Sequence, residues 1–291
     1  MRRAVVDAGC RESRLRSGEP DTLATVRGAD VRGFHARHWG PEGTTLVLAG
    51  DFDVDAALAV ADTELGGWRN PLQREVRAPA PTARAGTAYL IDRPGSVQAD
   101  IRWGWFTLDR TDPRWADLQI AGNALGGAHL SRLNRVLREE KGFTYGASLV
   151  SAPLRTGGIT YAQGSFRNEV VGATLELLPT LVDVTATPIT GAEVKRACDY
   201  LVGVSPIRYA TASGVCDGVL SLLGVGLGPD FVDAQLEAFR LVTPESASRV
   251  TAELIRPDAG ALVIVGDAGV LAAQVRAAGW DPIVVGPGEW L

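Results

Sequence analysis

The chain has 291 residues, which is enough for one large domain or about two ordinary ones. Hydrophobic residues make up 46% and charged residues 22% of it, a balance that is typical of soluble globular proteins and excludes a disordered or fibrous chain. The net charge of −5 gives no reason to expect nucleic acid or an anionic membrane surface as a partner.

The same sequence indicates a reducing compartment and no membrane. The N-terminal residues lack the apolar stretch of a secretory signal, and no apolar run approaches the ~20 residues that a membrane span needs. Cys10, Cys198 and Cys216 are an odd number without the short spacing of a metal site or a disulfide framework. We therefore expect a cytoplasmic protein with no membrane partner.

The first predicted elements lie in a block that recurs near the C-terminus. VRGADVRGFHARHWGPEGTTLVLAGDF, from Val26, resembles VTPESASRVTAELIRPDAGALVIVGDA, from Val242, at a constant offset of 216 residues. Both blocks predict a helix, a proline-containing turn, a buried strand (Thr45–Ala49 and Ala261–Val265), a Gly-Asp pair and a closing helix that ends in Gly-Trp. Such self-similarity indicates a duplicated unit.

Each Gly-Asp pair follows a predicted buried strand and precedes a helix. Asp51 and Asp267 are therefore expected to cap these helices, and their recurrence with the fold argues against a catalytic role.

Between the two blocks, apolar spacing and turn residues predict an alternation of strands and helices. The strands are expected at Ala88–Asp92, Gln98–Phe106, Gly146–Ala152 and Gly158–Phe166. The helices are expected from Pro113 to the Gly126-Gly127 stop, after Ser131, and at Glu169–Val184, Gly191–Val204, Tyr209–Leu223 and Asp230–Phe239, with Pro179 and Pro206 kinking or ending their segments.

These elements predict an α+β protein built from duplicated α/β-sandwich units, each with a mixed or antiparallel sheet covered by helices. Residues 88–291 would form one complete unit, and residues 1–68 the rear part of a second. Residues 69–87, rich in proline, alanine and arginine, read as a linker. The half unit would leave apolar surface exposed, so we expect it to be poorly ordered, covered by a partner, or docked in an unusual way.

The segment LGGAHLSRLNRVLREEKGFTY, from Leu125 to Tyr145, carries the most chemical information. Its two glycines end the preceding helix, Ser131 is placed to cap the next one, and Gly142 is placed to end it. The helix between them would turn an apolar stripe toward the core, made of Leu130, Leu133, Val136 and Leu137.

Arg138 lies in the last turn of this helix and Tyr145 at the start of the following strand-like run. The common role of such an arginine is to pair with a glutamate or with the helix dipole, and such a tyrosine commonly just packs. From the spacing alone, a structural role is the preferred interpretation of both residues.

The pattern GG-x-x-x-SRL-x-x-x-L-RE-x-x-G-x-x-Y, however, resembles the signature of the C-terminal half of insulinase/pitrilysin-type zinc metallopeptidases, the inverzincins. The resemblance continues at pattern level through DRPGSVQADIRWG and the second repeated block, although we assign no chemistry to Gln98. It implies a protein of two like halves that encloses a peptide substrate. Arg138 and Tyr145 would then bind the scissile carbonyl oxygen and stabilise the oxyanion.

In that family the zinc ligands and the general base form an H-x-x-E-H motif in the front part of the first unit. None of the three histidines here, His35, His38 and His129, falls in such a motif, and all three have simpler structural or surface roles. The resemblance therefore implies that this chain binds no metal, that zinc lies on the partner half, and that the chain alone is inactive.

Three functions stay open at this point. The chain could be the non-zinc subunit of a heterodimer that takes part in proteolysis with an H-x-x-E-H-bearing homologue. It could instead be a non-catalytic scaffold or binding subunit. It could also be a fragment of a two-unit zinc peptidase whose N-terminal half is missing, because Met1 falls in the middle of a repeat.

Overall fold

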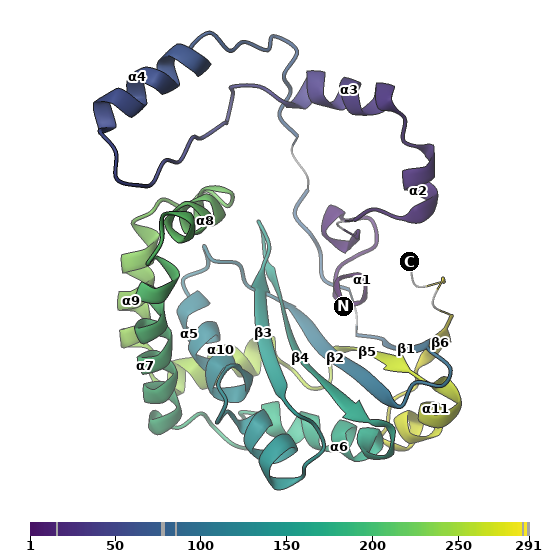
Figure 1. Cartoon of the computed structure of the whole chain (residues 1–291). Coiled ribbons are helices and arrows are strands. Elements are labelled where there is room, and N and C mark those ends of the chain that lie inside the picture. The colour runs from purple at the N-terminus through teal and green to yellow at the C-terminus, as the bar shows by residue number, and fades with distance from the viewer. Residues whose placement is uncertain (16, 77–78, 85, 287, 290–291) are drawn as a thin grey trace. The chain divides into compact units, whose positions relative to one another are not determined.

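A computed structural model of the chain describes residues 1–15, 17–76, 79–84, 86–286 and 288–289 (Figure 1). The chain divides into two compact units. Unit 1 comprises Met1–Arg14, Ala80–Ser205 and Asp230–Leu291, and unit 2 comprises Leu15–Pro79 and Pro206–Pro229. The predicted domain boundaries after residues 68 and 87 stay a prediction.

Unit 1 is built on one six-stranded sheet. Its strands are β1 (Ala88–Asp92), β2 (Gln98–Thr107), β3 (Ala147–Pro153), β4 (Gly158–Arg167), β5 (Ala261–Gly266) and β6 (Ile283–Val285), in the order β3-β4-β2-β5-β1-β6. β1 pairs in parallel with β5 and β6, whereas the pairs among β2, β3, β4 and β5 are antiparallel. The α+β fold with a mixed sheet is thus confirmed, and β5 is a central strand with β1 and β2 as its neighbours.

Helices cover this sheet, and most lie where the apolar spacing predicts them (Figure 1). In unit 1 they are α1 (Arg2–Val5), η1 (Arg11–Ser13), α5 (Trp115–Gly122), η2 (Asn123–Gly127), η3 (Asn134–Glu140), η4 (Asn168–Val170), α6 (Val171–Val182), α9 (Phe231–Leu241), α10 (Pro244–Leu254) and α11 (Ala268–Ala277). The helix α7 (Gly191–Arg208) continues through Pro206 and ends two residues later. A proline this close to the end of a helix removes only one backbone N–H donor, so the helix does not have to stop at it.

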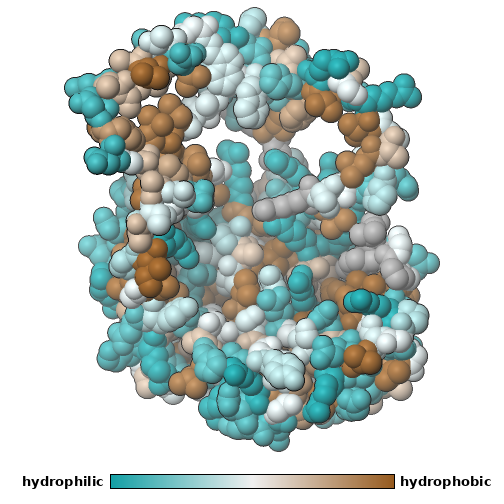
Figure 2. Space-filling view, viewed as in Figure 1, coloured by the Kyte–Doolittle hydropathy of each residue, from teal (hydrophilic) through white to brown (hydrophobic). Residues whose placement is uncertain are grey.

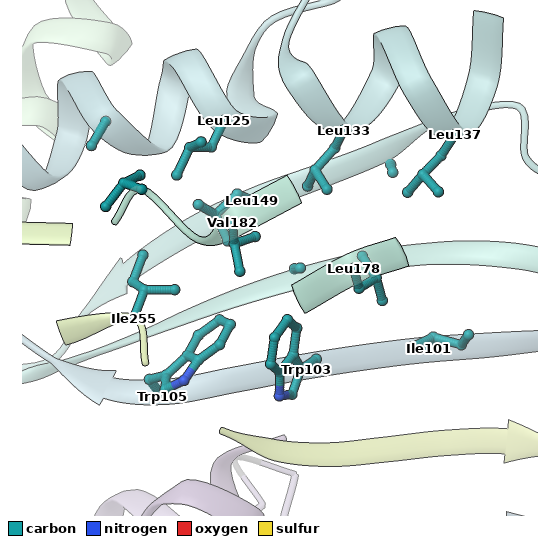
Figure 3. Packing of buried hydrophobic residues seen from close by; sticks show 14 of the residues in the cluster. Ile101, Trp103, Trp105, Leu125, Leu133, Leu137, Leu149, Leu178, Val182 and Ile255 are labelled. Carbon is teal, nitrogen blue, oxygen red and sulfur yellow. The ribbon is translucent and has the colours of Figure 1, made fainter. Parts of the chain in front are cut away.

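The main core lies between the sheet and these helices. Figure 3 shows Ile101, Trp103 and Trp105 of β2 pointing into the same interior as Leu133 and Leu137 of the helix layer. The rings of Trp103 and Trp105 lie 4.6 Å apart between centroids, and Trp105 Nε1 donates a hydrogen bond of 2.7 Å to the Arg256 carbonyl. Alternation along β2 therefore places its large rings on the helix-covered face.

The opposite face of the sheet carries a smaller cluster. Val5 and Val6 of the N-terminal segment pack there against Tyr89, Ile91 and Val263. Strands β1 and β5 are therefore buried on both faces, which explains their continuous apolar sequences.

Unit 2 contains α2 (Pro20–Thr25), α3 (Gly28–His38), α4 (Val54–Leu65) and α8 (Ala212–Leu223). Within residues 17–76 that the structure describes, Gly40 is the one buried residue. Figure 2 shows hydrophobic side chains on the surface around α4. Residues 17–76 thus expose their apolar side chains instead of enclosing them in a core.

The predicted buried strand Thr45–Ala49 is wrong for this structure. The segment is extended but pairs with no strand among the described residues, and Leu46 and Leu48 are 52% and 48% exposed. The apolar run has strand character, but a strand becomes part of a sheet only where neighbouring strands pair with it.

The cap of α4 also differs from the prediction. Asp53 Oδ1, not Asp51, accepts the Ala56 N–H at 2.8 Å, because α4 begins two residues later than the repeat implies. In the second block the prediction is confirmed, since Asp267 Oδ1 accepts the Gly269 N–H at 3.0 Å and caps α11.

The three cysteines are free. In the described part of the chain, every helix is too short or too polar to cross a bilayer. The cytoplasmic location stays a prediction.

Candidate functional site

The segment from Gly126 to Tyr145 packs a wide-turned helix against β3. In η3 the Lys141 N–H bonds to the Val136 carbonyl at 3.0 Å, a spacing of five residues that defines a π-helical turn. The Phe143 N–H then reaches back to the Leu137 carbonyl at 2.8 Å. Gly142, at φ +62°, ends the helix as predicted, because this backbone conformation suits glycine.

Two predicted details of this helix are wrong. The hydroxyl of Ser131 accepts a 3.4 Å hydrogen bond from Asn134 Nδ2, and no described backbone N–H bonds to it. Leu130 is 70% exposed, because it precedes the helix and lies in the turn after η2. Leu133 and Leu137 are fully buried, so the apolar stripe itself is confirmed.

Arg138 lies at the margin of this packed helix with its side chain 36% exposed. Its Nη1 lies 2.9 Å from His129 Nδ1, and its Nε lies 3.4 Å from Glu139 Oε1. Nδ1 of the histidine accepts this hydrogen bond only when that nitrogen carries no proton. His129, read from the sequence as a loop residue, thus positions the guanidinium.

Tyr145 lies in the short connection between η3 and β3 and is 94% exposed. Its backbone is held by Thr144, whose Oγ1 donates to the Ser165 carbonyl at 2.7 Å and accepts the Gly146 N–H at 3.1 Å. The backbone of Tyr145 is therefore fixed to β4, while its phenol projects into solvent.

Asn134 is a site residue that the sequence analysis missed. Its Oδ1 accepts the Ala147 N–H at 2.9 Å, and its Nδ2 donates to the Ala128 carbonyl at 3.1 Å. This one amide ties the turn before η3 to the first residue of β3, and so fixes both ends of the segment that carries Arg138 and Tyr145. In the sequence, the one sign of this role is that a polar residue, Asn134, falls within the apolar stripe of the predicted helix.

The predicted break at the two glycines has a packing reason. A Cβ on Gly126 would lie 2.2 Å from the Leu149 backbone nitrogen. Only glycine lets η2 approach β3 this closely. The close approach in turn determines where η3 begins.

Arg132 anchors the other face of the same helix and was also missed. Its guanidinium pairs with both carboxylate oxygens of Glu193, at 2.7 and 2.8 Å, and donates to the carbonyls of Thr187 and Pro188. Burial alone would raise the pKa of Glu193, but hydrogen bonds from Arg132 and Thr190 outweigh it and lower the pKa to about 2. The pair fixes the helical turn just before η3 to the start of α7.

A cavity of about 700 Å³ opens in unit 1 beside this segment. Gly146 and Ala147 line it next to Tyr145, together with polar side chains of β2 and β4 that include Arg102, Gln163 and Ser165. Its lining offers both hydrogen-bond donors and acceptors.

The described residues do not fit a zinc ion. Across them, no three histidine, cysteine or carboxylate side chains gather as a metal site requires. His38 Nδ1 instead lies 3.2 Å from the Arg74 carbonyl, and His35 stacks on Trp39 at 5.9 Å between centroids.

Comparisons with known proteins agree with this fold. Residues 25–201 match the family described as the peptidase M16 inactive domain. The chain is 26% identical over 246 residues to an uncharacterized zinc protease of Streptomyces coelicolor, covering 82% of this chain and 53% of that protein. It is 25% identical over 191 residues to an uncharacterized zinc protease of Bacillus subtilis, covering 64% and 45%. The chain thus spans about half the length of these curated relatives.

Among solved structures, a peptidase M16 inactive domain from Pseudomonas fluorescens superimposes with a TM-score of 0.76 at 19% identity, covering 88% of this chain and 61% of that one. A chain of complex III2 from Candida albicans superimposes with a TM-score of 0.77 at 15% identity, covering 96% and 68%. At these identities the likeness concerns the fold alone.

Proposed function

The chain belongs to the family of the peptidase M16 inactive domain, and we propose that it supplies Arg138 and Tyr145 to a peptidase site whose metal-bearing half lies on an H-x-x-E-H partner. That half would be a separate homologous subunit or a part of the same protein outside this sequence. The curated relatives that carry the name zinc protease are about twice as long, which supports a second half.

The two side chains would act as hydrogen-bond donors. The guanidinium of Arg138 and the hydroxyl of Tyr145 would donate to the carbonyl oxygen of the scissile peptide bond, and these bonds would strengthen as the oxygen gains negative charge. Neither group can activate water, because arginine stays protonated and the phenol is a weak base at neutral pH. The chain by itself therefore has no route to hydrolysis.

The exposed phenol of Tyr145 is the observation that carries this proposal. A large aromatic side chain at 94% exposure gains nothing from packing, yet hydrogen bonds on both sides fix its backbone. An unpacked side chain on a fixed backbone is suited to contact a second molecule. The adjoining cavity supplies room for the rest of a peptide.

The test is a zinc-dependent peptide assay in a mixture of this chain with an H-x-x-E-H homologue. Arg138→Ala and Tyr145→Phe should each lower the rate by ~10²–10³, the usual cost of one oxyanion donor, while circular dichroism and melting stay unchanged. Arg135→Ala and Tyr200→Phe are matched controls, since Arg135 is 61% and Tyr200 53% exposed, and both should retain activity.

If activity in the two site variants falls only in proportion to a lost folded fraction, both residues are structural. Loss of the phenol hydroxyl without any change in rate would likewise remove Tyr145 from the site.

A scaffold role is the second candidate. Arg138 already has His129 and Glu139 as partners, so its charge is satisfied without a substrate. If the mixture shows complex formation but no peptidase activity with any H-x-x-E-H homologue, the scaffold role is the better description.

A further inference from the structure

The cavity beside Tyr145 is lined by one basic side chain that the structure describes, Arg102 of β2. Arg102 is exposed, and among the described residues no carboxylate lies within ion-pair distance of it. Its guanidinium lies over the ring of Tyr161, with Cζ 5.7 Å from the ring centroid. The ring face attracts the charge and leaves the N–H groups at the edge of the guanidinium free to donate. Arg102 therefore presents an unpaired positive charge to the cavity.

The acidic and amide side chains of the same lining already have partners. Asp100 accepts a hydrogen bond from the Ser165 hydroxyl, and Gln163 Nε2 donates to Ser148 Oγ at 3.3 Å. Asp100 and Arg102 are two residues apart on one face of β2 but form no ion pair with each other. The cavity thus holds a cation that its own carboxylate does not neutralise.

The strand register places Arg102 a short peptide length from Tyr145. Arg102 lies opposite Gln163 of β4, which lies opposite Ser148 of β3. Strand β3 begins two residues after Tyr145. Neighbouring strands are ~4.8 Å apart, so Arg102 lies roughly 10 Å across the sheet from β3, a distance that an extended peptide covers in about three residues. A peptide whose scissile bond lies at Tyr145 would therefore bring a side chain about three residues away to the guanidinium.

We propose that Arg102 is a specificity-determining residue that binds a carboxylate of the peptide, about three residues from the scissile bond. A planar guanidinium pairs with a carboxylate through two parallel, charge-assisted hydrogen bonds, which a neutral amide of the same size cannot reproduce. The carboxylate belongs either to an aspartate or glutamate side chain or to the C-terminus of the peptide. The ligand class, a peptide, rests on the proposed function, whereas the preference for a carboxylate rests on Arg102 and its surroundings.

Binding of short labelled peptides to the full chain, followed by fluorescence anisotropy, tests this preference without any peptidase activity. Two peptides of one sequence differ at a single internal residue, glutamate or glutamine, and both have amidated C-termini. A third carries the glutamine and a free C-terminal carboxylate. The glutamate peptide should bind at least about tenfold more tightly than its glutamine counterpart, and the preference should shrink at high salt. Tight binding of the third peptide alone would assign the carboxylate to the peptide C-terminus.

Variants of Arg102 link the preference to this side chain. Arg102→Gln should remove the preference, and Arg102→Lys should retain part of it, because lysine keeps the charge without the planar donor fork. Arg102→Glu should reverse it, so that a peptide with lysine at the tested position binds more tightly than the glutamate peptide.

Arg276→Gln is the matched control. It removes the same charge from an exposed side chain of α11, a helix that packs on the other face of the sheet, and it should keep the preference. The melting temperature should stay unchanged in all of these variants, because both arginines are exposed.

Equal affinity for the three peptides would overturn the proposal. So would a preference that Arg102→Gln leaves intact, or one that Arg276→Gln also removes. Failure of the proposed function has a different signature: the mixture with an H-x-x-E-H homologue would show no hydrolysis that depends on Arg138 and Tyr145, whether or not a carboxylate peptide binds preferentially. Hydrolysis of all three peptides with the same kcat/KM would overturn the role of Arg102 alone and leave the proposed function standing.

Discussion

Arg132 and Arg138 lie six residues apart in one helical segment and have opposite surroundings. Arg132 is 9% exposed and paired at every donor group that the structure describes, whereas Arg138 is 36% exposed and held by a single histidine and a neighbouring glutamate. The first arginine therefore serves the fold, and the second retains freedom to contact a ligand. Asn134, between them, links the two roles by fixing the helix to β3.

The pair of Arg132 and Glu193 predicts a pH dependence of stability. The pKa of Glu193 is lowered from 4.5 to about 2 in the folded chain, so the stabilisation is complete above pH 4.5 and is lost as the pH falls toward 2. Glu193→Gln should lower the free energy of unfolding by about 2 kcal/mol at pH 7 and by much less at pH 3. Denaturant titrations at the two pH values measure this difference.

Glu140→Gln is the control for this prediction. Glu140 pairs with Arg135 at 2.8 Å on the surface, where ion pairs contribute at most about 1 kcal/mol, so its effect should be small at both pH values. An equal loss of stability in Glu193→Gln at pH 7 and pH 3 would contradict the assignment.

At the residue level, the sequence predicts a site at Arg138 and Tyr145 because their spacing follows a family pattern. It could not reveal Asn134 or the Arg132–Glu193 pair. Arg132 lies 61 residues from its carboxylate partner along the chain, so the pair follows from the tertiary fold and not from local spacing.

Among the elements, the contact between η2 and β3 leaves no room for an added side-chain carbon. Gly126→Ala would place a methyl group 2.2 Å from the Leu149 nitrogen, so the helix or the strand must move. We expect a loss of stability of about 1–3 kcal/mol, in the range of overpacked cores. Thermal melting and denaturant unfolding measure it.

Gly203→Ala is the matched control for this substitution. Apart from its chain neighbours and its own helix backbone, no described residue has an atom within 4 Å of a Cβ at Gly203 in α7, so the change should stabilise the chain by up to about 1 kcal/mol through helix propensity. If Gly126→Ala also stabilised the chain, the close approach would not constrain the fold.

The elements that the sequence predicts well are those whose signals are local. β1 has the predicted bounds, and β2, β3 and β4 agree to within one residue at each end, because turns and alternation mark where they begin and stop. The prediction of a buried strand at Thr45–Ala49 is wrong for the complementary reason. Its sequence encodes a buried strand, but burial depends on neighbours that the local sequence does not describe.

For the whole molecule, the repeat and the absent H-x-x-E-H motif lead to a prediction about metal. Because no three suitable ligands gather within the described residues, the purified chain should retain well under one zinc per molecule after dialysis. Elemental analysis by mass spectrometry gives the ratio, with an H-x-x-E-H homologue as the positive control. Stoichiometric zinc on this chain alone would refute the divided site.

The wide turn at the end of η3 determines the direction of Arg138 as much as the identity of the residue does. One residue more or fewer in a helix rotates everything beyond it by roughly 100° about the axis. A one-residue deletion between Leu133 and Arg138 that restored ordinary α-helical winding would therefore swing the guanidinium away from His129 without changing either residue. The direction of the Arg138 guanidinium therefore depends on how the backbone winds. A related chain with the same residue types but with this turn shifted by one position would point its arginine in another direction.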